Sequence, residues 1–374
     1  MEWSIPPLSE DSGLLDLILM KALILAGGSG TRLRPLTCTR SKQLLPLASS
    51  TLIGYMLDRL HDAGVSEVLL ATGPGLDDLQ DTLGDGSNYG ITLHYSIEPQ
   101  PLGTAGAIKH AEQHLRKEKS FLVLNGDIVS DINYTQLIQF HEQQQATATI
   151  TLYRVEDPSR FGVVEIDSER RIHNFVEKPD PRDAPRNLIN AGCYVLENTV
   201  LEHIPASQEV SIEREIFPAL CKSTKVVGWE HHGIWVDTGT PESFLKAQQA
   251  LVIETAQTPL IGAKTKIASS AVIGKNVTIG KRATIGPNAH INDAVLFDDV
   301  IIGAGVTIEQ SIIGQGAVIG KALQLKKHVI VGDGAIIDAG ANIPPGSLIC
   351  PQYHVKKGET PPPCFVKNYK SLNV

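Results

Sequence analysis

A six-residue period runs through the last third of the chain and restricts its fold more than any other feature. From about Pro259 onward an Ile, Val or Leu recurs at nearly every sixth position, often followed by Gly, as in the run AVIGKNVTIGKRATIG. One buried aliphatic residue per hexad is typical of a parallel β-helix, in which each hexad forms one flat side of a triangular coil. The period shifts by one residue after Phe297 and again after Ile308, which indicates adjusted corners. We therefore expect a left-handed β-helix over residues 260–350, followed by a Pro-rich C-terminal tail over 351–374.

The segment before this repeat alternates short apolar runs with stretches of helical period. Between Met20 and about Val252, the runs KALILA, EVLLAT and SFLVLNGD have the composition of strands, whereas TLIGYMLDRLHDAG has that of an amphipathic helix. This alternation predicts an α/β domain over residues 20–255, with a mixed, mostly parallel Rossmann-like sheet. Ligands of such sheets bind beyond the carboxyl ends of the strands, which is where the glycine-rich and acidic segments of this chain fall.

The net charge, the first 19 residues and the cysteines indicate which partners the protein binds and in which cell compartment it works. The net charge of −8 is spread without a basic stripe, which argues against nucleic-acid binding, and no apolar run approaches the roughly 20 residues that cross a membrane. Residues 1–19 lack the basic start and cleavage site of a signal peptide, which predicts an N-terminal extension on a cytoplasmic protein. The five cysteines are odd in number, scattered and without a CxxC pair, a pattern that fits neither a disulfide framework nor a zinc site.

A glycine-rich turn follows the first expected strand. Gly27, Gly28 and Gly30 come directly after the run ALILA, and Thr31 and Arg32 follow them. Glycine lets the main chain approach a ligand closely, so that successive amides can surround a phosphate, and an arginine just beyond supplies a bidentate donor. The turn lacks the third glycine of the dinucleotide fingerprint and the Gly-Lys-Ser/Thr ending of a P-loop. Taken alone, the pattern also fits a tight turn without a ligand.

Two aspartates each end a short apolar run. Asp127 closes FLVLNGD and Asp237 closes GIWVD. Mg²⁺ keeps several waters and takes only one or two protein carboxylates plus phosphate oxygens, so two distant aspartates that converge at the sheet edge are sufficient. We therefore predict that Asp127 and Asp237 bind Mg²⁺, with a strand-end cap as the alternative for each.

These motifs, taken in order, resemble the family of sugar-1-phosphate nucleotidyltransferases across essentially all of residues 20–252. The resemblance implies an enzyme that joins an NTP to a sugar 1-phosphate and releases pyrophosphate, often with a hexapeptide-repeat domain attached. The motifs that carry it are GGSGTRL at 27–33, PLT at 35–37, SKQLLP at 41–46, PLGTAGA at 101–107, LNGD at 124–127, RFGVVE at 160–165, FVEKP at 175–179, INAGCYVL at 189–196, SIEREIFP at 211–218 and WVDTGTPESFLKA at 235–247.

The resemblance also assigns roles to residues. Charge accumulates on phosphate oxygens during the transfer, so cationic groups must surround the α-phosphorus; Arg32 and Lys42 are the candidates. By resemblance, Lys178 contacts the sugar phosphate and Glu177 accepts hydrogen bonds from sugar hydroxyls. The full prediction has a catalytic set (Arg32, Lys42, Asp127, Lys178, Asp237), a nucleotide-binding set (Gly27, Gly28, Gly30, Thr31, Glu98, Gly103) and a sugar-binding set (Gly162, Glu177, Asn190).

Glu98 bears on the choice of nucleotide. An ionised carboxylate only accepts hydrogen bonds, which suits the N1–H and N2–H donors of guanine and opposes a pyrimidine carbonyl. Thymidylyl- and uridylyl-transferring relatives tend to carry glutamine here, and RFGVVE through SIEREIFP is similar to mannose-1-phosphate guanylyltransferases, so GTP and mannose 1-phosphate are favoured. The SKQLLP segment with Gln43 instead resembles the long glucose-1-phosphate thymidylyltransferases, so thymidylyl or uridylyl transfer to glucose 1-phosphate stays open.

Three further hypotheses concern the chain as a whole. A catalytically silent regulatory paralogue is the main alternative to an enzyme, although all five catalytic candidates are present. An acyltransferase coil would use His290 or His328 as its general base. Flat aliphatic sides and exposed coil ends predict a homo-oligomer formed through the β-helix.

Overall fold

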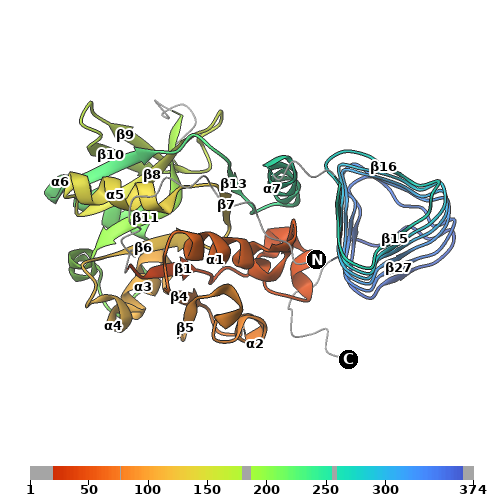
Figure 1. The fold of residues 1–374 in the computed structure, drawn as a ribbon, viewed down its shortest axis with the longest axis horizontal. Helices are drawn as coiled ribbons and strands as arrows, with labels where there is room; N and C mark the ends of the chain where they lie inside the picture. Colours follow the sequence, from red (N-terminus) through yellow and green to blue (C-terminus); the bar gives the residue numbers. More distant parts are fainter. Residues whose placement is uncertain (1–19, 76, 179–186, 255–258, 365–374) are drawn as a thin grey trace.

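The computed structural model describes residues 20–75, 77–178, 187–254 and 259–364. An α/β sheet with its helices lies at one end of the molecule and a triangular coil at the other, with one long helix, α7, between them (Figure 1). The expected N-terminal extension and the last ten residues of the expected tail lie outside the described residues.

The α/β part is built on one nine-stranded mixed sheet, as predicted. At its centre β1 (Ala22–Leu25) runs parallel to β4 (Glu67–Thr72) on one side and to β6 (Ser120–Asn125) on the other. Successive parallel strands therefore leave β1 in opposite directions, which opens a crevice at its carboxyl end. The other strands of this sheet are β5 (Thr92–Ile97), β8 (Ala148–Arg154), β9 (Gly162–Ile166), β10 (Ile172–Glu177), β11 (Leu188–Glu197) and β12 (Val226–Glu230).

Helices cover both faces of this sheet. Helix α1 (Leu52–Asp62) begins at Thr51, whose Oγ1 accepts a hydrogen bond from Gly54 N, and buries apolar residues at helical spacing. Alternate strand residues point to opposite faces, so Ile24 packs with α1 and α5 while Leu23 packs with α3 and α6. The remaining helices are α2 (Asp77–Leu83), α3 (Gly103–His110), α4 (Glu112–Leu115), α5 (Tyr134–Gln144), α6 (Phe217–Ser223) and α7 (Pro241–Glu254).

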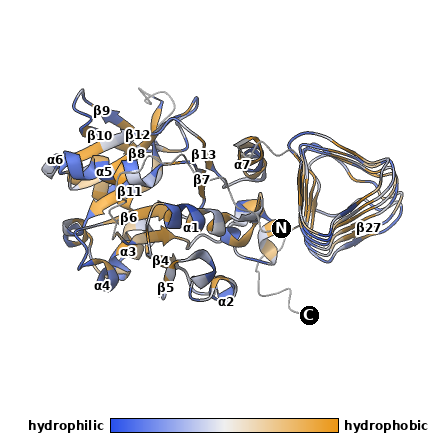
Figure 2. Ribbon diagram, in the orientation of Figure 1, coloured by the Kyte–Doolittle hydropathy of each residue, from blue (hydrophilic) through white to orange (hydrophobic). Residues whose placement is uncertain are grey.

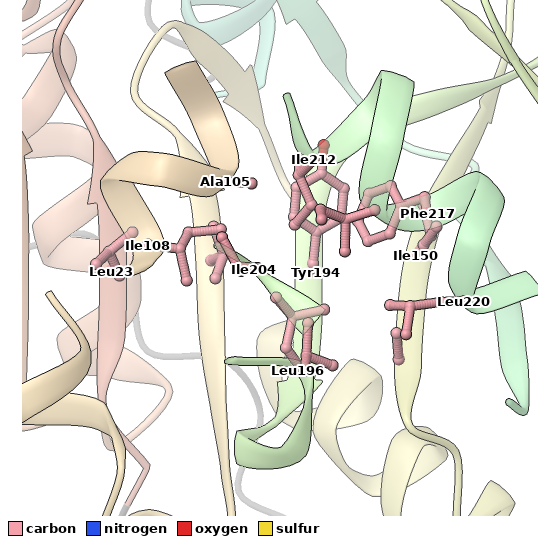
Figure 3. Packing of buried hydrophobic residues seen from close by; sticks show 14 of the residues in the cluster. Leu23, Ala105, Ile108, Ile150, Tyr194, Leu196, Ile204, Ile212, Phe217 and Leu220 are labelled. Carbon is pink, nitrogen blue, oxygen red and sulfur yellow. The ribbon is translucent and has the colours of Figure 1, made fainter. Parts of the chain in front are cut away.

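The α3–α6 face has an aromatic centre. Tyr194 of β11 is fully buried and packs edge-on against Phe217, with ring centroids 4.9 Å apart, and Ile212 lies beside it (Figure 3). Figure 2 shows the same division of polarity, with hydrophobic colour along the central strands and hydrophilic colour on the outer surface of α5. This packing fixes the segment 211–217 over the sheet.

The expected left-handed β-helix has three faces of stacked parallel strands. Its first face consists of β14 (Leu260–Ile261), β17 (Thr278–Ile279), β20 (Val295–Leu296), β23 (Ile312–Ile313), β26 (Ile330–Val331) and β28 (Leu348–Ile349). Its second face consists of β15 (Lys266–Ile267), β18 (Thr284–Ile285), β21 (Ile301–Ile302), β24 (Val318–Ile319), β27 (Ile336–Ile337) and β29 (His354–Val355). Its third face consists of β16 (Val272–Ile273), β19 (His290–Asn292), β22 (Thr307–Glu309) and β25 (Gln324–Lys326).

Two details of the coil differ from the sequence prediction. The first shortened hexad lies between β19 and β20, ahead of Phe297, because Phe297 packs against the α/β part instead of closing a regular coil. The second lies between β22 and β23, as predicted after Ile308. The coil also continues to β29, past residue 350.

The cysteine prediction was wrong at one pair. Cys350 and Cys364 form a disulfide, with Cα atoms 5.1 Å apart, which ties the tail at Cys364 back onto the last coil. The total count and wide scatter concealed this local pair, whose members are 14 residues apart. Cys38, Cys193 and Cys221 are free thiols.

Two neighbouring isoleucines in β21 point in opposite directions, one into the coil and one to its outside. Ile302 is 1% exposed inside the coil, whereas Ile301 is 47% exposed on the outside. We expect Ile302→Ala to destabilise the protein by about 2–5 kcal/mol, because it leaves a cavity. Gln324→Ala, at an exposed outward position of β25 on the third face, is the control and should change stability by about 0.5 kcal/mol or less. Urea unfolding measures both, and equal losses would contradict the assigned directions.

Candidate active site

The glycine-rich loop lies at the carboxyl end of β1, beside the central crevice of the sheet. Gly27, Gly28 and Ser29 are exposed, and within the described part of the chain their amides, like that of Gly30, have no hydrogen-bond acceptor. Gly30 has a positive φ of 59°, and Thr37 Oγ1 donates to its carbonyl at 2.8 Å. These free amides offer the donors that an anion requires.

The β7–β13 ladder brings the two predicted metal ligands together. Strand β7 (Ile128–Ser130) pairs antiparallel with β13 (Trp235–Asp237), and Asp237 lies opposite Ile128, the neighbour of Asp127. Thr238 donates from both N and Oγ1 to the Asp127 carbonyl, at 2.9 and 2.8 Å. Two residues far apart in the sequence therefore present their carboxylates at one place.

Both predicted phosphate-binding cations reach this pair of carboxylates. Lys42 is 6% exposed, and its Nζ donates to Asp127 Oδ2 at 2.9 Å. Arg32 lies against Gly239: a Cβ on that glycine would lie 2.7 Å from Arg32 Nη2 and 2.8 Å from Asp237 Oδ1. Glycine at 239 therefore permits the close approach of the guanidinium and the carboxylate.

Ionisation of Asp237 is disfavoured at this position. Burial, and next the charge of Asp127, raise the pKa of Asp237, while Lys42, the Gly239 amide and Arg32 oppose the shift. A divalent cation between the two carboxylates would relieve this repulsion, so the donor set fits Mg²⁺. In the described ranges, no three or more His, Cys, Asp or Glu side chains are grouped so that they could hold a metal ion by themselves, so any metal here would need ligands from substrate and water as well.

Glu98 lies beside the glycine loop, just after β5. Its side chain is buried, Oε2 accepts from Leu102 N at 2.8 Å, and Oε1 is 3.7 Å from where a Cβ on Gly27 would be. Burial raises the pKa of Glu98. Gly103 begins α3 at φ 69°, and a Cβ there would be 2.6 Å from Val210 O, so the structure requires glycine at 103 for packing.

Gln43 supports the loop from inside. It is 2% exposed, and its Nε2 donates to Ala26 O at 3.2 Å. This bond links the loop that carries Lys42, here called the lysine loop, to the end of β1. The bond from Gln43 to Ala26 gives this side chain a structural role in the loop.

The predicted sugar-binding residues form a second group on β9, β10 and β11. Gly162 pairs with Glu177, and a Cβ on this glycine would lie 2.7 Å from Glu177 Oε2. Lys178 follows with a positive φ of 50°, and its Nζ is 3.7 Å from Glu177 Oε1. Asn190 donates from Nδ2 to Tyr194 Oη at 2.8 Å, so one of its amide hydrogens is engaged inside the fold.

Glu213 also lies in this region, although it was not predicted to be a site residue. Its Oε2 accepts from Thr104 Oγ1 (2.7 Å) and from Ser211 Oγ (2.9 Å). Burial first, and then the charge of Glu213, raise the pKa of Glu177. The motif SIEREIFP was the available signal, but nothing in its spacing separates this glutamate from its two charged neighbours.

The two groups are connected through Trp235. This residue of β13 precedes Asp237 by two positions, donates from Nε1 to Ala191 O at 2.8 Å, and packs in one cluster with Val163, the neighbour of Gly162. The strand that carries Asp237 therefore also contacts the part of the sheet that carries the predicted sugar-binding residues.

The two histidines of the acyltransferase hypothesis lie in different surroundings. His290 is exposed on β19 of the third face, whereas His328 lies at a turn before β26 with φ 65°. His328 lines a shallow crevice with Pro241 and Leu245 of α7. Almost no free volume remains between these residues, which leaves no room for a substrate there.

Comparison with known proteins agrees with this geometry. The family described as "Nucleotidyl transferase" matches residues 21–253, and that described as "GMPPB C-terminal domain" matches residues 255–362. A mannose-1-phosphate guanylyltransferase of Mycobacterium tuberculosis is 41% identical over 242 residues, which are 64% of this chain and 67% of the relative. A mannose-1-phosphate guanyltransferase of Aspergillus oryzae is 37% identical over 271 residues, 68% and 74% of the two chains.

A solved structure is similar in fold as well. HddC from Yersinia pseudotuberculosis, in complex with GMP-PN, superposes with a TM-score of 0.54 at 26% identity, over 62% of this chain and all of that one. The chain therefore belongs to the nucleotidyl transferase family, and the predicted class of sugar-1-phosphate nucleotidyltransferases is confirmed. Among the described helices, none has the length and apolar character to cross a membrane.

Asp237→Asn should stabilise the folded protein at neutral pH. Because the fold raises the pKa of Asp237, its ionisation weakens the folded state. We expect Asp237→Asn to raise the melting temperature at pH 7.5 by about 1–3 °C. The gain should vanish at a pH below the unfolded pKa, where both states are protonated. Scanning calorimetry across this range measures it.

Asp299→Asn is the control for this prediction. Its hydrogen bond with Arg282 lowers the pKa of Asp299, so removing this charge should give no gain in melting temperature. A lower melting temperature for Asp237→Asn at pH 7.5 would contradict the assigned repulsion.

Proposed function

We propose that the chain transfers a guanylyl group from GTP to mannose 1-phosphate, producing GDP-mannose and pyrophosphate. The observation that carries this choice is the Glu98 carboxylate, which lies next to the phosphate-binding loop with Oε1 uncommitted among the described side chains and amides. Carboxylate oxygens accept from the N1–H and N2–H groups of guanine and repel a pyrimidine carbonyl. The names of the relatives point the same way.

The reaction forms one bond and breaks one. An oxygen of the sugar phosphate attacks the α-phosphorus of GTP, and the bond from that phosphorus to the bridging oxygen of the β-phosphate breaks, so that pyrophosphate leaves. We assign the free amides of residues 27–30 and the Arg32 guanidinium to the phosphates of GTP. Lys42 faces the reacting phosphate with a buried ammonium that Asp127 orients. Catalysis then consists mainly of positioning and charge stabilisation.

Asp127 and Asp237 are the residues that would hold Mg²⁺. When bound, this ion supplies positive charge to the phosphate oxygens. The carboxylates themselves have two tasks: Asp127 orients Lys42, and Asp237 lies beside Arg32. Both tasks bring cations to the place where the α-phosphate charge develops.

The sugar 1-phosphate is assigned to the second group of residues. Lys178 is 55% exposed, while Glu177 is 15% exposed and lies beside Gly162. A largely buried acceptor next to an exposed cation suits a ligand with hydroxyls at one end and a phosphate at the other. Asn190 keeps amide capacity for a sugar hydroxyl in addition to its bond to Tyr194.

A silent regulatory role has no support in the geometry. Such a paralogue would be expected to have lost a phosphate-holding or metal-binding side chain, yet Lys42 is buried and in hydrogen-bond contact with Asp127. Thymidylyl or uridylyl transfer remains the alternative activity, and the same assay distinguishes it.

The activity prediction combines a substrate panel with one substitution. We expect pyrophosphate release with Mg²⁺ to be fastest for GTP with mannose 1-phosphate, among five NTPs crossed with mannose and glucose 1-phosphates, and to stop when EDTA removes the metal. Glu98→Gln should lower kcat/KM for GTP relative to dTTP by about 10–100-fold, because an amide can donate to a pyrimidine carbonyl.

Glu112→Gln is a suitable control. Glu112 begins α4, after Glu98 in the chain, and forms ion pairs with Lys109 of α3 and with Arg116 just beyond α4. It should leave the nucleotide preference unchanged. Faster reaction of the parent protein with dTTP or UTP and glucose 1-phosphate would overturn the guanine assignment, and inactivity with every pair would favour the regulatory role.

We also propose that the chain forms a homo-oligomer through the β-helix. On its second face, Ile301 (47% exposed) and Ile336 (40% exposed) flank Val318, to which both are paired. Multi-angle light scattering should give a mass of at least two chains at micromolar concentration, and Ile301→Lys should lower it. A monomer at tens of micromolar would refute the association.

A further inference from the structure

The loop that carries Lys42 is tied to the β-helix just before the lysine. Thr39 Oγ1 donates to Asp333 Oδ2, at 2.5 Å and across 294 residues of sequence. Arg40 Nη2 donates to the same oxygen and, at 3.0 Å, to Gln315 Oε1. Two successive residues of the catalytic part are therefore held by one corner of two successive coils.

The β-helix fixes the Asp333 carboxylate by its own stacking. Asp333 Oδ1 accepts from the Gln315 amide, one coil earlier, at 2.8 Å. A Cβ on Gly314 would lie 2.7 Å from that same oxygen, so glycine permits the two coils to approach there. The Asp333 and Arg40 side chains are only 14% and 19% exposed. Charge-assisted bonds with this degree of burial hold their geometry better than exposed ion pairs do.

An apolar contact lies next to this ion pair. The guanidinium carbon of Arg40 is 5.8 Å from the centroid of the Phe297 ring. Phe297 is 1% exposed and belongs to one cluster with Leu36, Leu45 and Phe244 of the catalytic part. The cluster limits the movement of the coil relative to the loop. The distance between Arg40 and Asp333 can therefore change little.

The residues after Arg40 are anchored too. Ser41 N donates to Asp78 Oδ2 at 2.6 Å, and its hydroxyl donates to the other oxygen of that carboxylate. Lys42 then begins a three-residue 3₁₀ turn, Lys42–Leu44, that has no side-chain cap. Four successive residues thus have fixed partners, and those of the first two belong to the β-helix.

We propose that Asp333 is a positioning residue for the transfer reaction. It holds Arg40, and through Arg40 the backbone of Lys42, so that the Lys42 ammonium remains on Asp127. Asp333 acts through the loop and does not touch the substrates. The chemical part of this inference rests on the proposed function, whereas its geometric part does not.

Asp333→Asn is the direct variant, and Asp338→Asn is its matched control. Asp338 also pairs with a basic side chain of the coil, His354, at 3.0 Å, but both side chains are exposed and the pair lies within the β-helix. We expect Asp333→Asn to lower kcat by about 10–100-fold, the order that misplacement by an ångström produces. The KM for the sugar 1-phosphate should stay unchanged, and Asp338→Asn should keep the parent kcat.

A double variant separates positioning from general structural support. If Asp333 acts through Lys42, then Asp333→Asn should lower kcat no further once Lys42→Met is present. A general structural role would lower the rate of the Lys42→Met enzyme again, by the same factor, and that result would overturn the proposal. An unchanged kcat in Asp333→Asn alone would overturn it as well.

Amide hydrogen exchange tests the geometric part without substrates. Leu44 N donates to Ser41 O at 3.0 Å, and Leu45 N donates to Lys42 O at 3.1 Å. These amides should exchange at least about fivefold faster in Asp333→Asn and at the parent rate in Asp338→Asn. If exchange is faster in Asp333→Asn while the parent protein transfers no nucleotide, the positioning role is supported and the proposed function is rejected. Unchanged exchange would reject the positioning whatever the substrates are.

Discussion

The site depends on holding two like charges together. The β7–β13 ladder and the double donation from Thr238 place Asp127 and Asp237 side by side, although burial, and next the charge of Asp127, raise the pKa of Asp237. A fold accepts such a cost where function requires it, because like-charged carboxylates become favourable once cations lie between and around them. Lys42 and Arg32 supply part of this charge. Substrate-bound metal would supply the rest.

Backbone geometry around this centre leaves little choice of residue. Gly30 adopts a left-handed conformation, and Gly239 lets Arg32 approach Asp237. The exposed amides of the loop provide donors that no part of the described fold uses. The same crevice at the end of β1 therefore offers fixed cations, fixed carboxylates and free amides, and this combination is suited to a triphosphate.

The β-helix takes part in this arrangement through its first face. Val295, Ile312 and Ile330 on that face share one apolar cluster with Leu245 of α7. The Arg40–Asp333 contact lies at the same junction and adjoins the lysine loop. The coil is therefore joined to the part of the catalytic sheet where phosphate chemistry is proposed, which gives a physical reason for the two parts to occur in one chain.

Sequence reasoning reached the elements that follow from periodicity. The hexad pattern predicted the coil, and alternating runs predicted the mixed sheet, because burial imposes both patterns directly on the residues. Contacts between distant segments were not accessible in this way. The Arg40–Asp333 contact, the environment of Glu213 and the Cys350–Cys364 disulfide depend on how turns meet in space, which no local spacing records.

The most direct test of the central claim is a crystal structure of the chain with GTP and Mn²⁺, whose anomalous scattering locates the ion in place of Mg²⁺. The account predicts one ion bound by the carboxylates of Asp127 and Asp237, with the phosphates against the amides of residues 27–30 and the guanine edge facing Glu98. An ion bound elsewhere, or phosphates away from Lys42, would contradict it.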